Sequence, residues 1–365
     1  MNPHTLIEKG LLPDSVIRFG IRRLLKKTLR RERRDGIESQ QEAIQTWVDR
    51  LNEAPIAIET DAANEQHYEV PTDFYLKSLG PRLKYSCGLY ERPDTTLAEA
   101  EEAMLRLYCK RMGLEDGMRV IDLGCGWGSM TLWIAEHYPN CEVTSVSNSA
   151  TQRAFIEKRA AELGAADRVT VHTCDINKFE TDERFDRGVS IEMFEHLRNY
   201  RSLFERISRW LKPDGALFVH IFTHGRHAYP YEIDETGKQD NWMASRFFTG
   251  GQMPSDHLLF YFPEHLTVSR HWRVDGRHYE RTSNHWLENL DANRAEVERI
   301  LSQDGEDGRK AARAWRVFFM ACAELWGFAE GQEWFVSHYL LKPRPQTNDS
   351  WNESPKHYST EASMA

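Results

Sequence analysis

Paired cysteines are missing from this chain, whose six cysteines are scattered over 365 residues without any CxxC spacing. Disulfide frameworks and structural zinc sites need cysteines in close or regular spacing, so we expect reduced thiols and no metal site. The sequence also lacks an apolar run of membrane-spanning length, and its N-terminal residues show no apolar signal-peptide region. We therefore expect a soluble, cytoplasmic protein.

An overall excess of basic residues is missing as well. The formal net charge is −9, so the chain as a whole is not predicted to bind nucleic acid. Residues 14–35 are a local exception, because lysines and arginines alternate there with apolar residues at helical spacing. One interpretation is an amphipathic helix on an anionic membrane, which would place the protein at the inner face of the membrane. The other is a helix docked on the protein with its basic side chains in solvent, and the sequence leaves both open.

The chain does contain a regular alternation of strands and helices. Between residues 96 and 213 this alternation predicts an α/β fold with a doubly wound parallel sheet. Residues 1–60 are expected to form a helical N-terminal extension, residues 61–342 the main domain and residues 343–365 a disordered polar tail. Residues 225–262, rich in aromatic residues and glycine, interrupt the alternation. We predict that they form an α-rich insertion covering the carboxyl ends of the strands, where α/β sheets bind ligands.

The segment VIDLGCGWGS is the most informative motif. An apolar run ends in Asp122, and Gly124, Gly126 and Gly128 follow before the next predicted helix. Glycines permit close approach of the backbone to a ligand, and a helix N-terminus offers free N–H groups. Dinucleotide-binding enzymes and methyltransferases both use such turns. The order D-L-G-C-G resembles motif I of class I S-adenosylmethionine (SAM) methyltransferases, whereas a dinucleotide fold more often reads GxGxxG.

The next two strand ends add candidate cofactor residues. The turn VSNSATQ lacks the acid that most class I methyltransferases direct at the ribose hydroxyls, so Ser147, Asn148 and Gln152 are expected to supply these hydrogen bonds. Asp175 ends a later strand and matches the acid that usually accepts from the adenine amino group. The alternative for Asp175 is an ordinary helix cap.

The stretch SIEMFEHLRNY places Glu192, Glu195 and His196 within five positions after a predicted strand. Three roles are open: metal ligands, catalytic acid and base, or acids at the start of a helix, where the helix dipole favours negative charge. The metal role has the least support, because the stretch lacks the i, i+4 histidine pair of a zincin helix. The position after a strand, downstream of motif I, favours catalysis.

Six segments of this kind occur in one order: HYEVPTDFY, LKYSCGLYE, VIDLGCGWGS, SVSNSATQ, IEMFEH and LFVHIFTH. Together they make residues 5–342 resemble the cyclopropane-fatty-acyl-phospholipid synthase family, which includes mycolic-acid methyltransferases and coclaurine N-methyltransferases. The opening GLLPDSVIRFGIRRLL, the insertion and the ending EWFVSHYLLK are more similar to the coclaurine N-methyltransferase-like branch. The resemblance implies transfer of a one-carbon unit from SAM, with S-adenosylhomocysteine as the product.

The resemblance also implies roles for individual residues. Tyr85 and Ser86 match positions near the methionine portion of SAM, and the rest of the cofactor site matches Gly124, Gly126, Ser147, Asn148, Gln152 and Asp175. In the N-methyltransferases, the residues that match Glu192, Glu195 and His196 line an amine pocket and assist deprotonation. In the cyclopropane synthases, the residues that match Cys87, Glu195, His220 and Tyr279 hold a bicarbonate ion. Because both sets are complete, the acceptor remains open between a small amine or amphiphile and an unsaturated lipid acyl chain.

Overall fold

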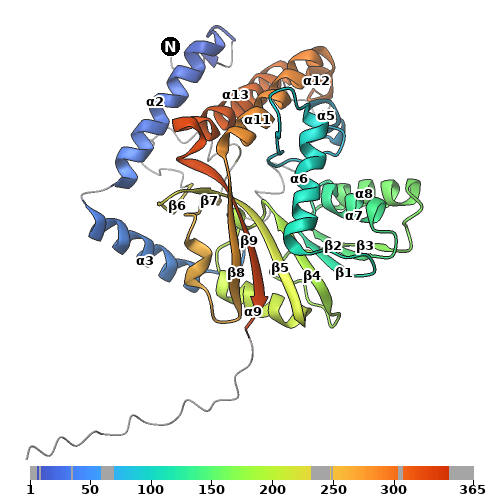
Figure 1. Cartoon of the computed structure of the whole chain (residues 1–365). Helices are drawn as coiled ribbons and strands as arrows, with labels where there is room; N and C mark the ends of the chain where they lie inside the picture. The colour runs from blue at the N-terminus through green and yellow to red at the C-terminus, as the bar shows by residue number, and fades with distance from the viewer. Residues whose placement is uncertain are drawn as a thin grey trace, which may run out of the picture.

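The computed structural model describes residues 6–7, 10–33, 36–58, 70–231, 247, 250–302 and 307–344. They form a seven-stranded sheet in the order β3-β2-β1-β4-β5-β9-β8 (Figure 1). The strands are β1 (Arg119–Leu123), β2 (Glu142–Ser147), β3 (Val169–Thr173), β4 (Phe185–Ile191), β5 (Leu211–His224), β8 (Leu266–Val274) and β9 (Trp334–Pro343). The predicted α/β sheet is confirmed.

The first five strands are parallel, whereas β9 runs antiparallel to both β5 and β8. The reason lies in the connection between β8 and β9. The helices of residues 276–326 join these strands at one edge of the sheet, so β9 starts at the edge where β8 ends and runs back (Figure 1). All the parallel strands therefore end at the edge covered by these helices.

Helices cover both faces of the sheet, and the alternation of side chains along β5 shows how. Phe218 and Phe222 belong to one hydrophobic core, together with residues of α6 (Leu97–Met112) and α7 (Ser129–His137). Leu217, Val219 and Ile221 belong to the other, together with residues of α9 (Tyr200–Trp210) and α3 (Ile37–Glu53). Helix α8 (Ala150–Glu162) packs beside β3. His220 lies between Phe218 and Phe222, so its side chain is on the α6 face.

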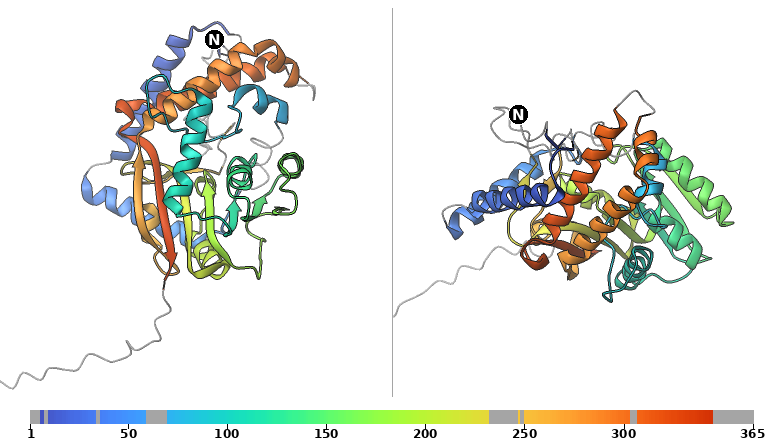
Figure 2. Two further views of the ribbon diagram at one scale, coloured as in Figure 1. Left: turned by 45° about the vertical axis from the view of Figure 1, so that its right-hand side comes forward. Right: turned by 90° about the horizontal axis from the view of Figure 1, so that it is seen from above.

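A helical cap lies over the edge at which the parallel strands end (Figures 1 and 2). Its members are α2 (Asp14–Arg33), α5 (Thr72–Ser78), α11 (Gly276–Ala292), α12 (Arg294–Ile300) and α13 (Gly308–Trp326). The apolar stripe of α2, which consists of Ile17, Ile21, Leu25 and Leu29, packs on the core of the cap. Ion pairs Arg18–Glu324 and Asp14–Arg316 fasten the same helix to α13 at 3.0 and 2.9 Å. The docked arrangement predicted as one alternative for residues 14–35 is therefore present.

The described residues of the 225–262 insertion form a small two-stranded sheet and a 3-10 helix, namely β6 (Tyr229–Pro230), β7 (Gln252–Met253) and η2 (Leu258–Tyr261). Among the described residues, the helices over the strand ends are those of the helical cap. Buried Gln252 ties the insertion to the rest of the fold, because its Nε2 donates to the Leu197 carbonyl at 2.7 Å and its Oε1 accepts from the Trp47 indole at 2.9 Å. The remaining insertion residues, 232–246 and 248–249, and the predicted disordered tail from residue 345 lie outside the described residues. In the described part of the chain, no helix is both long and apolar enough to cross a membrane.

Candidate active site

The three glycines of the loop after β1 are needed for different structural reasons. Gly124 and Gly128 adopt φ values of +75° and +77°. A Cβ at Gly124 would lie 2.7 Å from Met193 Sδ, and one at Gly128 would lie 2.6 Å from Ile156 Cγ1. Gly126, at φ +53°, would meet no atom within 4 Å. The backbone of Gly126 therefore faces open space, as a ligand-binding turn requires, whereas the other two glycines permit close packing.

That open space is a cleft at the ends of β1, β2 and β3. Six predicted cofactor residues line it: Gly124, Gly126, Ser147, Asn148, Gln152, Asp175. The predicted catalytic residue His196 lines it too. The remaining walls are Ala57, Ile58, Val146, Cys174, Ile176, Met193 and Leu197.

Gln152 carries the observation that most directly indicates a polar ligand in the cleft. Its side-chain oxygen accepts from the Ser147 hydroxyl at 2.7 Å. Its Nε2 is buried and has no hydrogen-bond partner. A buried amide donor left unpaired costs about 1–3 kcal/mol, so a ligand acceptor such as a hydroxyl or carboxylate oxygen would be favoured there. SAM carries both kinds of oxygen, and the Gln152 environment fits it.

Asp175 sits in a turn rather than at the start of a helix. Its carboxylate accepts from the backbone and side-chain nitrogens of Asn177 at 2.8 and 3.1 Å. Asn177 in turn pairs with both backbone groups of Ala57 at 3.0 and 3.1 Å. Buried Arg206 of α9 fastens the same loop by donating to the Ile176 carbonyl at 2.8 Å. Ala57 and Ile58 of the N-terminal extension thus form part of this cleft, a long-range contact that no sequence motif indicates.

Other predicted cofactor residues support the cleft from outside its lining. Buried Asp122 accepts from the Thr131 hydroxyl at 2.7 Å and so holds the start of α7; burial raises the pKa of its carboxyl to about 6. Tyr85 packs between Tyr75 and Trp286, with ring centroids 5.4 and 5.5 Å apart.

Lys84, which no sequence motif singled out, is almost fully buried beside this segment. Its ammonium donates to the Ser86 hydroxyl at 2.5 Å and to the Cys87 carbonyl at 2.7 Å. Burial lowers the pKa of Lys84 to about 8. The predicted cofactor residue Ser86 is therefore engaged by a neighbouring cation, which fixes the shape of the KYSC segment.

Glu192 is next to the cleft-lining Met193, and three other predicted catalytic residues contact its carboxylate. Tyr279 of α11 donates its hydroxyl to Glu192 Oε2 at 2.6 Å. His220 of β5 places Nε2 3.0 Å from Glu192 Oε1. The backbone N–H of Cys87 donates to the same oxygen at 3.3 Å. Three separate elements of the chain therefore direct polar groups at a single carboxylate.

The backbone and the titration of Glu192 are both unusual. Its φ is +51°, in the left-handed region, which costs a residue with a Cβ about 1–2 kcal/mol. Burial raises the pKa of Glu192 to about 7, although the Tyr279 hydroxyl, the Lys84 ammonium and the Cys87 N–H each act to lower it. Strained backbone and a carboxyl that titrates near neutral pH are both typical of catalytic positions.

Glu195 lies in surroundings different from those of Glu192. Glu195 is fully buried, and its Oε1 accepts from the Phe222 N–H at 2.8 Å while Oε2 has no hydrogen-bond partner. Burial, followed by the charge of Glu192, raises the pKa of Glu195 well above its usual value. Of the two carboxyls, Glu192 accepts from three donors and is therefore ionised more readily. Glu195 is the carboxyl that more readily keeps its proton.

In the structure, the residues predicted to hold bicarbonate fall into two groups. His220, Tyr279 and the Cys87 backbone surround Glu192, while Glu195 faces the Phe222 amide. The thiol of Cys87 donates to the Gly88 carbonyl at 3.1 Å, and burial raises its pKa well above the usual value. Cys87 therefore contributes its N–H to this carboxylate rather than a thiolate.

Helix capping does not explain the EMFEH stretch. Residues Phe194–His196 form a short 3-10 helix, η1, and α9 begins only at Tyr200. The cap of α9 is Asn199, whose side chain accepts from the Ser202 N–H at 2.9 Å. Glu192 and Glu195 are therefore free of any capping role at α9.

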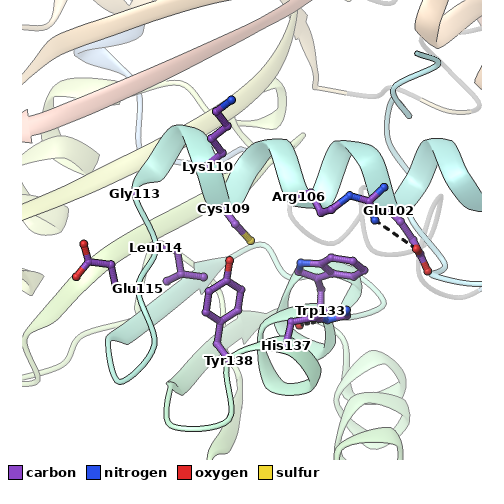
Figure 3. A pocket seen from close by; sticks show the side chains of 10 residues that line it. All are labelled: Glu102, Arg106, Cys109, Lys110, Gly113, Leu114, Glu115, Trp133, His137 and Tyr138. Carbon is purple, nitrogen blue, oxygen red and sulfur yellow. Dashed lines mark hydrogen bonds and ion pairs between the residues drawn. The ribbon is translucent and has the colours of Figure 1, made fainter. Parts of the chain in front are cut away.

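A second hollow lies on the outer side of α6, between this helix and α7 (Figure 3). It is lined by Arg106, Cys109, Trp133, His137 and their neighbours, and Figure 3 shows Arg106 paired with Glu102 at its rim. None of the predicted cofactor or catalytic residues lines it. The second hollow therefore has no connection with the predicted site residues.

The sheet order, together with a glycine loop after β1 that opens on a cleft at the strand ends, defines a class I SAM-dependent methyltransferase. Comparison with known proteins gives the particular group. Residues 57–332 match the mycolic acid cyclopropane synthetase family, and the chain belongs to this family.

Several relatives are similar over most of the chain. The (S)-coclaurine N-methyltransferase of Thalictrum flavum subsp. glaucum is 37% identical over 345 residues, covering 93% of this chain and 94% of the relative. The crystal structure of coclaurine N-methyltransferase bound to N-methylheliamine and S-adenosylhomocysteine superposes with a TM-score of 0.88 at 36% identity, covering 93% of this chain and 98% of that one. The cyclopropane-fatty-acyl-phospholipid synthase of Escherichia coli (strain K12) is 30% identical, covering 74% of this chain and 66% of the relative. The chain is thus a SAM-dependent methyltransferase, and the resemblance inferred from its motifs is confirmed.

Proposed function

We propose that this enzyme N-methylates a small amine that carries an aromatic group, with Glu192 as the base that frees the amine lone pair. The observation that carries the proposal is the convergence of His220, Tyr279 and the Cys87 N–H on the Glu192 carboxylate. The names of the relatives, which are largely amine N-methyltransferases, support the same class of acceptor.

The cofactor would be held by the lining of the cleft. Gly126 offers an open backbone, Gln152 an unpaired donor, and Asp175 an acceptor at the end of β3. SAM, when bound, supplies a methyl group on a sulfonium, which is a strong electrophile. Ser147 and Ser149 orient Gln152, since the Ser147 hydroxyl donates to its Oε1 and the Gln152 backbone N–H donates to Ser149 Oγ.

The chain's own part in the reaction is to move one proton and to position the amine. An amine is mostly protonated near neutral pH and has no free lone pair. The Glu192 carboxylate would take one N–H proton from a protonated secondary amine. The nitrogen lone pair would then form the bond to the methyl carbon as the carbon–sulfur bond of SAM breaks, leaving a protonated tertiary amine and S-adenosylhomocysteine. A base with a pKa of about 7 is well matched to this step at neutral pH. Glu195 and His196 remain predicted catalytic residues, and we propose that Glu195, in its protonated form, keeps a second negative charge away from Glu192.

Aromatic rings adjoin Glu192 and favour an aromatic amine. The Tyr279 ring stacks on Trp326 with centroids 4.8 Å apart and an interplanar angle of 2°. Trp286 meets Tyr279 edge-on at 5.9 Å and also contacts Tyr85 at 5.5 Å. Such rings attract a cation through their faces and an aromatic substrate through apolar contact. An ammonium attached to a ring satisfies both interactions.

Cyclopropanation or methyl branching of unsaturated phospholipid acyl chains is the alternative, and it would use bicarbonate as the base. The donors that the sequence assigned to bicarbonate, His220 and Tyr279, are engaged by Glu192 in this structure. We propose that the Glu192 carboxylate takes the place of the exchangeable anion. Bicarbonate and a role in lipid biosynthesis are accordingly not part of the proposal.

The test uses methyl-labelled SAM with either heliamine, the amine whose N-methyl form is bound in the solved relative, or phospholipid vesicles with unsaturated chains. We expect label in the amine and none in the acyl chains. The isosteric variant Glu192→Gln should lose about 100-fold or more of kcat, the usual contribution of a general base, while binding S-adenosylhomocysteine normally. Full activity of Glu192→Gln would show that Glu192 is not the base, and label in acyl chains would support the alternative.

A rescue experiment sharpens this test. Glu192→Gly relieves the left-handed backbone strain at φ +51° and leaves His220, Tyr279 and the Cys87 N–H facing an anion-sized space. Formate or bicarbonate should then restore part of the amine methylation. The control Glu180→Gly, at an exposed carboxylate that pairs with Arg206, should show no response to either anion. Absence of rescue in a folded, cofactor-binding Glu192→Gly would contradict the proposed geometry.

We also propose that α2 makes peripheral contact with anionic membranes. Its apolar stripe is used inside the protein, but its outer face presents Phe19, which is 63% exposed, beside the exposed basic residues Arg23 and Lys27. A basic surface with a protruding aromatic ring is suited to the headgroup region of an anionic bilayer. An amphiphilic acceptor would be delivered from the same surface.

A further inference from the structure

A buried hydrogen-bond chain continues from Glu192 to the far side of β9. Beyond Glu192, His220 Nδ1 lies 2.9 Å from His338 Nε2, and these two histidines are direct cross-strand neighbours on β5 and β9. The next link joins His338 Nδ1 to the guanidinium of Arg111, which belongs to α6. Tyr108 of the same helix places its hydroxyl 2.8 Å from His220 Nδ1. Both histidines are fully buried.

Arg111 decides where the hydrogens of this chain lie. A guanidinium has only donors, so His338 Nδ1 must be the ring nitrogen without a proton. Burial lowers the pKa of both histidines well below the usual value, so each ring is neutral and carries one proton. His338 therefore carries its proton on Nε2 and donates to His220 Nδ1. It follows that His220 carries its proton on Nε2 and donates to Glu192.

We propose that Arg111 and His338 are positioning residues that lock His220 in the tautomer donating to Glu192. The inference rests on the proposed role of Glu192 as the base. Without Arg111, His338 is able to carry its proton on Nδ1 and present a bare Nε2 to His220. His220 would then carry its proton on Nδ1 and turn a lone pair toward the Glu192 carboxylate, which would repel the charged form of the base. The Tyr108 hydroxyl does not select between the two tautomers, because it can either donate to His220 Nδ1 or accept from it.

The same polarity excludes the chain as an exit path for the catalytic proton. Every hydrogen points toward Glu192, and the far end is a guanidinium, which has no acceptor atom. To receive a proton from Glu192, His220 Nε2 would first have to lose the one it holds. The proton taken from the amine therefore leaves Glu192 on the side of the acceptor, and the chain of histidines acts as a fixed support.

Several ionisable groups surround Glu192 and contribute to its titration besides this chain. They come from the KYSC segment, α6, η1, β5, α11 and α13: Lys84, Cys87, Tyr108, Glu195, His220, Tyr279, Cys322. None of these residues is itself replaced in an Arg111 variant, and of them only His220 belongs to the histidine chain. A difference between the wild-type enzyme and an Arg111 variant therefore arises from the guanidinium and from the histidine chain that it orients.

The direct test is nitrogen NMR of histidine-labelled full-length protein, which distinguishes the two neutral tautomers. We expect wild-type His220 to carry its proton on Nε2. Arg111→Met should convert a substantial fraction of His220 to the Nδ1–H tautomer, whereas Arg111→Lys, which also has only donors, should retain the wild-type signal. Arg270→Met on the neighbouring β8, where the side chain is exposed, should change nothing. If His220 carries its proton on Nδ1 in the wild type, or if Arg111→Met leaves its tautomer unchanged, the proposal is refuted.

Kinetics provide the second readout. Arg111→Met should lose about 10- to 100-fold of kcat, the range found when residues that orient a functional group are removed. The acidic limb of its pH profile should move up by about one pH unit, because a hydrogen bond to the charged form of Glu192 is lost. Arg111→Lys should recover most of both losses, which a merely structural role for the arginine would not predict. The tautomer result stands even if Glu192→Gln proves active, so failure of this inference is distinguishable from failure of the proposed function.

Discussion

Removal of the Tyr279 hydroxyl tests the tuning of Glu192 most directly. The Tyr279→Phe substitution keeps the ring that stacks on Trp326 and deletes the 2.6 Å hydrogen bond to Glu192 Oε2. A hydrogen bond to a charged group contributes about 1.5–3 kcal/mol. Since 1.36 kcal/mol corresponds to one pKa unit, the pKa of Glu192 should rise by about 1–2 units from its value of about 7.

The sign of the effect on activity follows from the role of the base. Glu192 must be ionised to accept a proton, so a higher pKa moves the acidic limb of the rate profile to higher pH. At pH 7 the ionised fraction falls from about one half to between about one tenth and one hundredth. Methylation should therefore be about 5- to 50-fold slower at pH 7 and close to the wild-type rate at pH 9.

The assay is kcat as a function of pH with saturating SAM and amine, because this profile reports the groups of the bound complex. The matched control is Tyr339→Phe, which removes a 2.7 Å hydrogen bond to the Asp256 carbonyl on the opposite face of the sheet. The control should lose stability without moving the acidic limb. An equal loss of rate by Tyr279→Phe at pH 7 and pH 9 would refute the tuning of Glu192 by Tyr279.

Two further predictions concern the glycine loop and α2. Gly124→Ala should lower Tm clearly more than Gly126→Ala, because only the former places a Cβ against Met193, while Gly126→Ala should weaken binding of S-adenosylhomocysteine in calorimetry; equal Tm losses and equal affinities would contradict the assigned roles. Reversing two exposed charges with Arg23→Glu and Lys27→Glu should reduce co-sedimentation with anionic vesicles at least about 30-fold, since each basic residue contributes about 1 kcal/mol. Unchanged vesicle binding, with methylation of a soluble amine intact in both proteins, would show that α2 is only a docked helix.

The sequence motifs were sufficient to predict the fold and most of the residues that line the cleft. The alternation of strands and helices determined the sheet, and the glycine loop, Ser147, Asn148, Gln152 and Asp175 all line one cleft. These features are local, since each lies within a few residues of the end of its own strand. The carboxyl ends of parallel strands meet at one edge, so a sequence pattern alone brings such residues together.

Only the tertiary structure shows which carboxyl of the predicted catalytic residues receives the surrounding donors. In the sequence analysis, Glu195 belongs to both residue sets that the resemblance implies, whereas Glu192 belongs only to the amine set. The fold directs Tyr279, His220 and the Cys87 N–H at Glu192 instead, and it adds the buried cation of Lys84. These partners lie between 28 and 108 residues from Glu192 along the chain, so no local pattern reveals which of two carboxyls they will approach.

The contacts that support the site from outside could not be predicted from the sequence either. Ala57 of the N-terminal extension reaches the Asp175 loop, and Arg111 orients His220 through His338, across three elements of the fold. Sequence periodicity determines which face of a strand a side chain occupies, and hence that His220 lies on the α6 face. It does not determine which strand becomes its neighbour. The insertion of β9 beside β5 made that choice, and with it the direction of every hydrogen that points to Glu192.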